Sequence, residues 1–133
     1  MPATTPTILV VDDEPHIRQM LKLRLELDGR YQVITSENST VAVELAQMAQ
    51  PDLILLDVLM PGLSGYQVWH RLKAQESTRR IPIIFITAKN PQQDEELQCL
   101  LAQGAGYLTK PFETQDLLRT IETALADARR PST

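Results

Sequence analysis

The sequence contains a single cysteine, Cys99, among its 133 residues. One cysteine excludes an internal disulfide framework and a zinc site built on several cysteines, and it fits a reducing compartment. No apolar run reaches the roughly 18 residues that a membrane-spanning helix requires. The opening segment MPATTPT holds neither the basic residues nor the apolar stretch of a secretory signal. We therefore expect a cytoplasmic protein that does not contact the membrane.

Basic residues are also in short supply. Lys and Arg total 13 against 17 Asp and Glu, a formal charge of −4, which argues against a nucleic-acid surface on this chain alone. No G-x-G-x-x-G motif follows the first apolar run, so a dinucleotide-binding site is disfavoured. The sequence shows no repeat, linker or low-complexity segment, and its length suits one domain.

Short apolar runs recur at a steady interval along the chain. The first, third and fourth runs are apolar without alternation, a pattern typical of parallel strands that are covered on both faces. Four of the five runs are short enough to be strands. The five runs are Ile8–Val11, Tyr31–Ile34, Leu53–Leu56, Ile81–Ile86 (interrupted by Pro82) and Tyr107–Leu108.

Helical patterns follow each run. Pro15 suits the first position of the first helix, and Gly29 is a plausible stop. Five strands that alternate with five helices predict a (βα)5 chain, an α/β doubly wound parallel sheet with helices on both faces. The later helical patterns cover Ala42 to Ala49 (ended by Pro51), Gly65 to Leu72, about Gln92 to Gln103 (stopped by Gly104, with Cys99 expected to be buried) and Leu117 to Leu125.

Polar residues that could take part in catalysis or metal binding follow the ends of the predicted strands. Asp12 and Asp13 follow the first strand, Asp57 ends the third, and Thr87 and Lys110 come after the fourth and fifth. Ligands of open α/β sheets bind beyond the carboxyl ends of the strands. The sequence therefore predicts that three carboxylates, a hydroxyl and an ammonium converge on one edge of the sheet.

This combination of groups points to phosphoryl chemistry. Neighbouring carboxylates repel each other, and a hard divalent cation such as Mg²⁺, with oxygen ligands, relieves the repulsion. A carboxylate can act as a nucleophile that forms an aspartyl-phosphate, given a metal, a cation for the phosphoryl oxygens and hydrogen-bond donors. We interpret Asp57 as the phosphate acceptor, with Lys110 as the cation and Thr87 as a donor.

The chain resembles the receiver domain of two-component response regulators, the chemotaxis regulators included, over residues 7–128, which leaves 1–6 and 129–133 as short flexible tails. The resemblance implies a flavodoxin-like sheet with strand order 2-1-3-4-5. It also implies that a histidine kinase or histidine phosphotransfer protein phosphorylates Asp57. Four segments in chain order carry the resemblance: ILVVDDEP, PDLILLDVLMPGLSG, PIIFITA and GYLTKPF.

The same resemblance implies a metal site. Asp13 would bind Mg²⁺ directly and Asp12 largely through water, while Asp57 and the backbone carbonyl of Leu59 would complete the protein ligands. Mn²⁺ could substitute for Mg²⁺. Leu59 also stands where many relatives carry a polar group that orients the hydrolytic water, so we hypothesise slow self-dephosphorylation.

Further roles implied by the resemblance concern switching. Thr87 and Lys110 would bind the phosphoryl group, and Tyr107 would turn inward as Thr87 moves toward it. The Lys110–Pro111 bond is expected to be cis. A downstream protein would bind the face formed by the fourth helix, fifth strand and fifth helix, and a homodimer is left open.

Two other functions remain as alternatives. An aspartyl-phosphate-forming phosphatase or phosphotransferase would need a second carboxylate two residues after Asp57, where Leu59 stands. A receiver-shaped adaptor that is never phosphorylated would lack one of the core groups, and all of them are present. A receiver domain itself would catalyse only its own Mg²⁺-dependent phosphorylation and dephosphorylation. Whether the chain is a stand-alone regulator, as its Met1 start favours, or part of a longer one stays open.

Overall fold

The computed structural model describes residues 5–27, 29–60, 62 and 64–128. Of the two predicted tails, residues 1–4 and 129–133 lie outside this range. In the described part of the chain, five strands alternate with five α-helices and one 3₁₀ turn. The elements are β1 (Thr7–Val11), α1 (Pro15–Glu26), β2 (Gln32–Ser36), α2 (Ser39–Ala49), β3 (Leu53–Asp57), α3 (Gly65–Ala74), β4 (Ile83–Thr87), η1 (Pro91–Gln93), α4 (Glu95–Gln103), β5 (Gly106–Thr109) and α5 (Thr114–Ala128).

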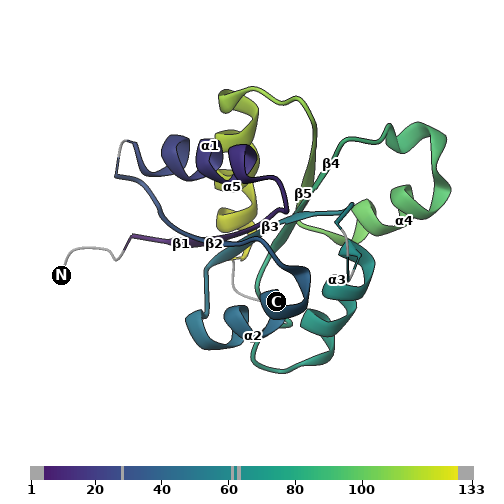
Figure 1. Ribbon diagram of the computed structural model, residues 1–133, viewed down its shortest axis with the longest axis horizontal. Coiled ribbons are helices and arrows are strands. Elements are labelled where there is room, and N and C mark those ends of the chain that lie inside the picture. The colour runs from purple at the N-terminus through teal and green to yellow at the C-terminus, as the bar shows by residue number, and fades with distance from the viewer. Residues whose placement is uncertain (1–4, 28, 61, 63, 129–133) are drawn as a thin grey trace.

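The strands form one parallel sheet in the order β2-β1-β3-β4-β5, which confirms the predicted topology. Helices α1 and α5 cover one face of the sheet, and α2, α3 and α4 cover the other (Figure 1). All five strands run in the same direction, so their carboxyl ends meet at one edge.

Alternate residues of the central strands feed two separate apolar layers. In β3, Leu53 and Leu55 face the layer under α1 and α5, while Ile54 and Leu56 face the layer under α2, α3 and α4. Because both faces are covered, every position of β3 and β4 is buried. The unbroken apolar runs in the sequence follow from this two-sided burial.

Two predicted boundaries, those of the fourth strand and the fourth helix, differ from the structure. β4 begins at Ile83 and not before Pro82, because proline has no N–H to donate to a neighbouring strand. The fourth helix begins at Glu95 and not near Gln92. Asp94 takes an extended conformation and its carboxylate accepts a hydrogen bond from the Leu97 N–H (3.0 Å), so it caps α4 and separates η1 from it.

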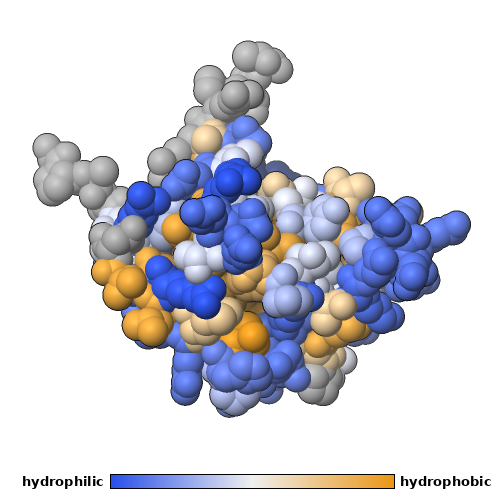
Figure 2. Space-filling model, turned by 90° about the horizontal axis from the view of Figure 1, so that it is seen from above, coloured by the Kyte–Doolittle hydropathy of each residue, from blue (hydrophilic) through white to orange (hydrophobic). Residues whose placement is uncertain are grey.

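The expected burial of Cys99 is wrong. Leu97, Leu100 and Leu101 occupy the buried side of α4, and Cys99 lies exposed on another side. Within the described residues, no helix has the length and apolarity to span a membrane. The face that carries α1 and α5 is mostly hydrophilic, with separate groups of hydrophobic residues (Figure 2).

The start of α3 leaves no room for a side chain. The Gly65 N–H donates to the Val58 carbonyl (3.0 Å), and a Cβ at Gly65 would lie 2.7 Å from the Val58 Cα. That atom is backbone in the loop after Asp57, so it cannot move without moving the loop. Glycine is therefore required here for close approach, although alanine is the better helix former.

We predict that Gly65→Ala lowers the free energy of unfolding by about 2 kcal/mol, the usual scale of overpacking, when measured by urea denaturation. Gly106→Ala is the matched control, since its Cβ would meet side-chain atoms and no backbone, Thr120 Cγ2 at 3.0 Å and Ile84 Cγ1 at 4.0 Å. The control should cost less. A Gly65→Ala protein as stable as wild type would contradict the prediction.

Candidate functional site at the carboxyl edge of the sheet

Four carboxylates gather at the carboxyl ends of β1 and β3. Asp12, Asp13 and Glu14 lead from β1 into α1, and Asp57 is the last residue of β3. Each offers an oxygen that lies within 4.8 Å of the others. Asp12 and Asp57 are buried, with 0% and 3% of their surface exposed. The adjacency of β1 and β3 in the sheet brings these acids together.

One ammonium group joins the carboxylates. The Lys110 Nζ donates to Asp12 Oδ2 (3.1 Å), to Glu14 Oε1 (3.2 Å) and to Asp57 Oδ2 (3.3 Å). The Lys110 backbone N–H donates to the Thr87 carbonyl (2.7 Å), which fixes the residue beyond the end of β5. The Lys110–Pro111 bond is cis, as expected. Lys110 therefore links the ends of three strands and the first residue before α1.

The side chains at three strand ends share one local geometry. Each accepts a hydrogen bond from the backbone N–H two residues later: Asp12 Oδ1 from Glu14 (2.9 Å), Asp57 Oδ1 from Leu59 (3.1 Å) and Thr87 Oγ1 from Lys89 (3.0 Å). Asp and Thr side chains favour such turns, which end the strand and hold the side chain at its edge.

The environment of Asp57 opposes its negative charge. Burial raises the pKa of the Asp57 carboxyl, and the neighbouring Asp12 raises it further. The Lys110 ammonium and the Leu59 N–H act in the opposite direction but only in part, and the pKa is about 6. Burial also disfavours the charged form of Lys110, yet Asp57, Asp12 and Glu14 outweigh this and raise its pKa above the ordinary value. Lys110 therefore stays an ammonium.

The donor set suits a hard divalent cation. Among the described residues, the four carboxylates outnumber the one ammonium that pairs with them, so this edge of the sheet carries excess negative charge. Mg²⁺ prefers carboxylate oxygens and retained waters, and its charge would lower the cost of ionising Asp57. The structure thus brings Asp12, Asp13 and Asp57 together, and their cluster fits a Mg²⁺ site.

Glu14 is the one member of this cluster that the prediction did not include. Glu14 reaches Lys110, a role that the sequence analysis did not assign; its place directly after Asp12-Asp13 and before the helix-starting Pro15 was the available signal. Tyr107, which is predicted to turn inward as Thr87 moves toward a phosphoryl group, has 48% of its surface exposed in this structure. Thr87 is buried at the same edge, one position beyond the residue of β4 that pairs with Asp57.

Known proteins are similar to this chain in both sequence and fold. The family model described as "Response regulator receiver domain" matches residues 8–122. The chain belongs to the response regulator receiver domain family. Members of this family act in two-component signalling and interact with histidine kinases and downstream effectors; they are regulators more than enzymes.

Individual relatives align with most of this chain. The phosphate regulon transcriptional regulatory protein PhoB of Pseudomonas aeruginosa is 42% identical over 119 residues, which are 90% of this chain and 51% of PhoB. This chain therefore spans about half the length of that relative. Protein PilH of the same organism is 41% identical over 120 residues, 90% of this chain and 97% of PilH.

A solved structure supports the reading of the acidic cluster. The receiver domain of sensor histidine kinase PA1611 from Pseudomonas aeruginosa has a TM-score of 0.82 and 34% identity, over 92% of this chain and 99% of that one. It was crystallised with a magnesium ion coordinated in its active site cleft. The four carboxylates of the present receiver domain fit the same kind of site.

The raised pKa of Asp57 makes stability depend on pH. Because its pKa rises from 3.8 unfolded to about 6 folded, the folded state binds the extra proton between these values, and stability falls as pH rises through them. We predict that, in EDTA, the Asp57→Asn protein is more stable than wild type above about pH 7, with a free energy of unfolding higher by at most about 3 kcal/mol. Below about pH 4 the two proteins should differ little, because Asp57 is then protonated in both the folded and the unfolded state.

Urea denaturation across this pH range measures the difference. Asp127→Asn, on the exposed surface of α5, is the matched control and should not reproduce it. Added Mg²⁺ should stabilise wild type and leave Asp57→Asn almost unchanged, since ligand binding stabilises only the form that binds. A difference between the two proteins that is constant with pH would contradict the assigned cause.

Proposed function

We propose that Asp57 accepts a phosphoryl group from a histidine kinase or histidine phosphotransfer protein and that the domain, residues 7–128, then controls a partner protein. The observation that carries the proposal is the buried Asp57 carboxylate with the Lys110 ammonium 3.3 Å from its Oδ2 atom, inside a cluster of four carboxylates. A carboxyl pKa of about 6 leaves Asp57 largely ionised near neutral pH, as a nucleophile requires.

The transfer step follows from the groups present. An Asp57 oxygen forms the new P–O bond while the P–N bond of the donor phosphohistidine breaks, and the departing imidazole takes up a proton. The Lys110 ammonium neutralises charge on the phosphoryl oxygens. The Thr87 hydroxyl accepts from the Lys89 N–H and keeps its own proton for donation to a phosphoryl oxygen.

Mg²⁺ fits the acidic cluster, and Mn²⁺, which accepts the same oxygen ligands, could substitute. Asp13 would bind it directly, Asp12 largely through water, and Asp57 with the Leu59 carbonyl would complete the protein ligands. Bound there, the ion supplies positive charge opposite the negative phosphoryl oxygens. Glu14 and Lys110 keep their pairing at the border of the cluster.

The output of phosphorylation is a shift between two conformations. Tyr107 is half exposed in this structure and Thr87 is buried. A phosphoryl group that draws in the Thr87 hydroxyl favours the conformation in which Tyr107 also turns inward, which reshapes the face of α4, β5 and α5. A downstream protein, or a second copy in a homodimer, binds this face. The protein acts in the cytoplasm and does not bind nucleic acid through this chain alone.

A phosphatase or phosphotransferase is the less favoured function. An enzyme that turns over an external phosphate ester needs a proton donor near the acceptor, and the side chain two residues after Asp57 is that of Leu59, which cannot move a proton. The domain catalyses only its own Mg²⁺-dependent phosphorylation and dephosphorylation.

We predict that acetyl phosphate with Mg²⁺ adds the mass of one phosphoryl group to the wild-type chain and none to Asp57→Ala. EDTA should strongly reduce labelling, because the charge of the metal is then missing. Intact-mass spectrometry measures both effects. Asp127→Ala is the control and should label like wild type; labelling of Asp57→Ala at another residue would overturn the assignment.

We also predict a long-lived phosphoryl group, since the half-exposed Leu59 side chain offers no polar atom to a hydrolytic water at the mouth of the site. Leu59→Asn should shorten the half-life of phosphorylated Asp57 severalfold, while Leu59→Met should keep it. Loss of label is followed by intact mass after removal of acetyl phosphate. An unchanged half-life in Leu59→Asn would refute the idea.

A further inference from the structure

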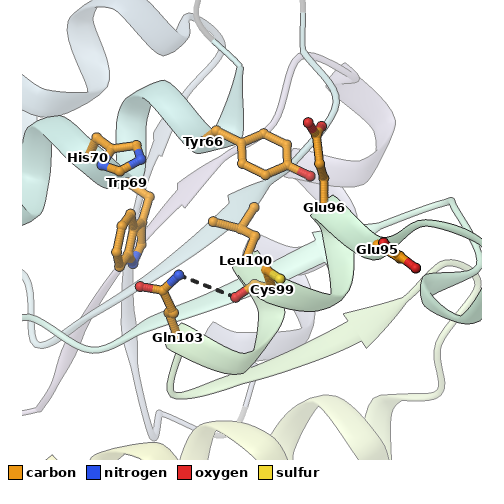
Figure 3. A pocket seen from close by; sticks show the side chains of 8 residues that line it. All are labelled: Tyr66, Trp69, His70, Glu95, Glu96, Cys99, Leu100 and Gln103. Atoms are coloured by element: carbon orange, nitrogen blue, oxygen red, sulfur yellow. Dashed lines mark hydrogen bonds between the residues drawn. The ribbon is translucent and has the colours of Figure 1, made fainter.

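Helices α3 and α4 enclose a groove of about 520 Å³ away from the carboxylate cluster (Figure 3). We call it the α3–α4 groove. Tyr66 and Trp69 of α3 form an aromatic wall, and Leu100 of α4 contributes a buried apolar surface. His70 packs edge-on against Trp69, with ring centroids 4.9 Å apart. The groove is large enough for a few side chains of another molecule.

The α4 side of the groove carries negative charge. Glu95 and Glu96 lie in the first turn of α4 and are exposed. Within the described part of the chain neither carboxylate has an ion-pair partner, whereas the neighbouring Asp94 pairs with the Lys89 Nζ (3.6 Å) and caps the helix. Acids at this position stabilise α4 through its dipole, but their charge over the groove is left unbalanced.

The carboxylates of α4 act on Tyr66 in the aromatic wall. Figure 3 places the Tyr66 hydroxyl beside Glu96. Burial raises the pKa of the Tyr66 phenol, and the carboxylates of Asp94 and Glu96 raise it further. These carboxylates therefore lie near enough to act on the Tyr66 hydroxyl. The face of the Tyr66 ring itself attracts cations.

Trp69 adds an unmet hydrogen bond. Its Nε1 atom is shielded from solvent and finds no acceptor among the described residues. A buried donor without an acceptor is costly, on the order of 1–3 kcal/mol. Gln103 lies at the same end of the groove, and its amide Nε2 donates to the Cys99 carbonyl of its own helix (3.3 Å) (Figure 3). A carbonyl that enters this end of the groove, with the Gln103 side chain moved aside, would bring an acceptor toward Trp69.

We propose that the α3–α4 groove binds a segment of a partner protein that presents an arginine or lysine next to an apolar side chain. The cation lies over the Tyr66 ring within reach of Glu95 and Glu96. The apolar side chain covers Leu100. A backbone carbonyl of the segment supplies the missing acceptor for Trp69. The groove lies away from the carboxylate cluster, so this binding does not require that Asp57 is the phosphate acceptor.

Trp69 is the sole tryptophan of the sequence, so its fluorescence reports on the groove in the full chain. The probe is the peptide acetyl-Leu-Arg-Leu-amide, compared with the peptide in which neutral citrulline replaces arginine. The arginine peptide should change the emission saturably and bind at least about fivefold more tightly, the scale of one or two exposed ion pairs. Equal affinity for both peptides, or no saturable change with the arginine peptide, overturns the proposal.

Charge variants test the acidic side of the groove. Glu95→Gln with Glu96→Gln should reduce the affinity for the arginine peptide to that for the citrulline peptide. The matched control, Glu44→Gln with Asp127→Asn, removes the same charge from exposed positions outside the groove and should keep wild-type affinity. An equal loss of affinity in the control would show that the effect comes from net charge alone and would overturn the proposal.

The aromatic wall and the identity of the occupant are tested separately. Tyr66→Leu keeps an apolar side chain and removes the ring, so it should weaken the arginine peptide and leave the citrulline peptide little changed. Wild-type affinity for the arginine peptide in this variant would contradict a cation over the ring. Emission that changes with protein concentration alone, together with a dimer in sedimentation, would assign the groove to a second copy of the chain and overturn the proposed partner.

Discussion

The contact between the Lys110 ammonium and the carboxylates of Asp12, Asp57 and Glu14 is the interaction on which the candidate site depends. Four acids at one edge of an apolar sheet repel each other, and two of them are buried. The strand order places β1 beside β3, and so Asp12 beside Asp57, while β5 lies two strands away from β3 at about 10 Å. A long side chain is needed to cross β4, and lysine has the length and the charge.

Backbone N–H groups partly stabilise the negative charges of Asp12 and Asp57. The strand-end turns at Asp12 and Asp57 give each carboxylate one N–H donor, and Lys110 supplies more. These contacts do not balance burial, since the pKa of Asp57 is still raised to about 6. The folded receiver domain therefore retains an unfavourable charge arrangement at a functional edge, where an added cation or phosphoryl group changes the energy most.

The elements around the site connect it to the surface. α3 begins in the loop after Asp57, and α4 begins in the loop after Thr87. These same helices enclose the α3–α4 groove, and α4 also borders β5 on its other side. Gly65 fits closely against Val58 in the first of these loops, so the packing of α3 and the position of Asp57 are set together.

Local pattern determined most of the fold and the edge chemistry. Unbroken apolar runs specified buried parallel strands, helical spacing specified the covering helices, and strand ends placed Asp12, Asp57 and Lys110 at one edge. Local pattern did not reveal that Glu14 turns back toward Lys110, that Asp94 delays the start of α4, or that Cys99 is exposed. These features depend on which neighbours a side chain meets after packing, and so does the groove between α3 and α4. Periodicity along the chain is a property of the sequence, whereas side-chain direction at a helix start and the space between two helices exist only once the layers have assembled.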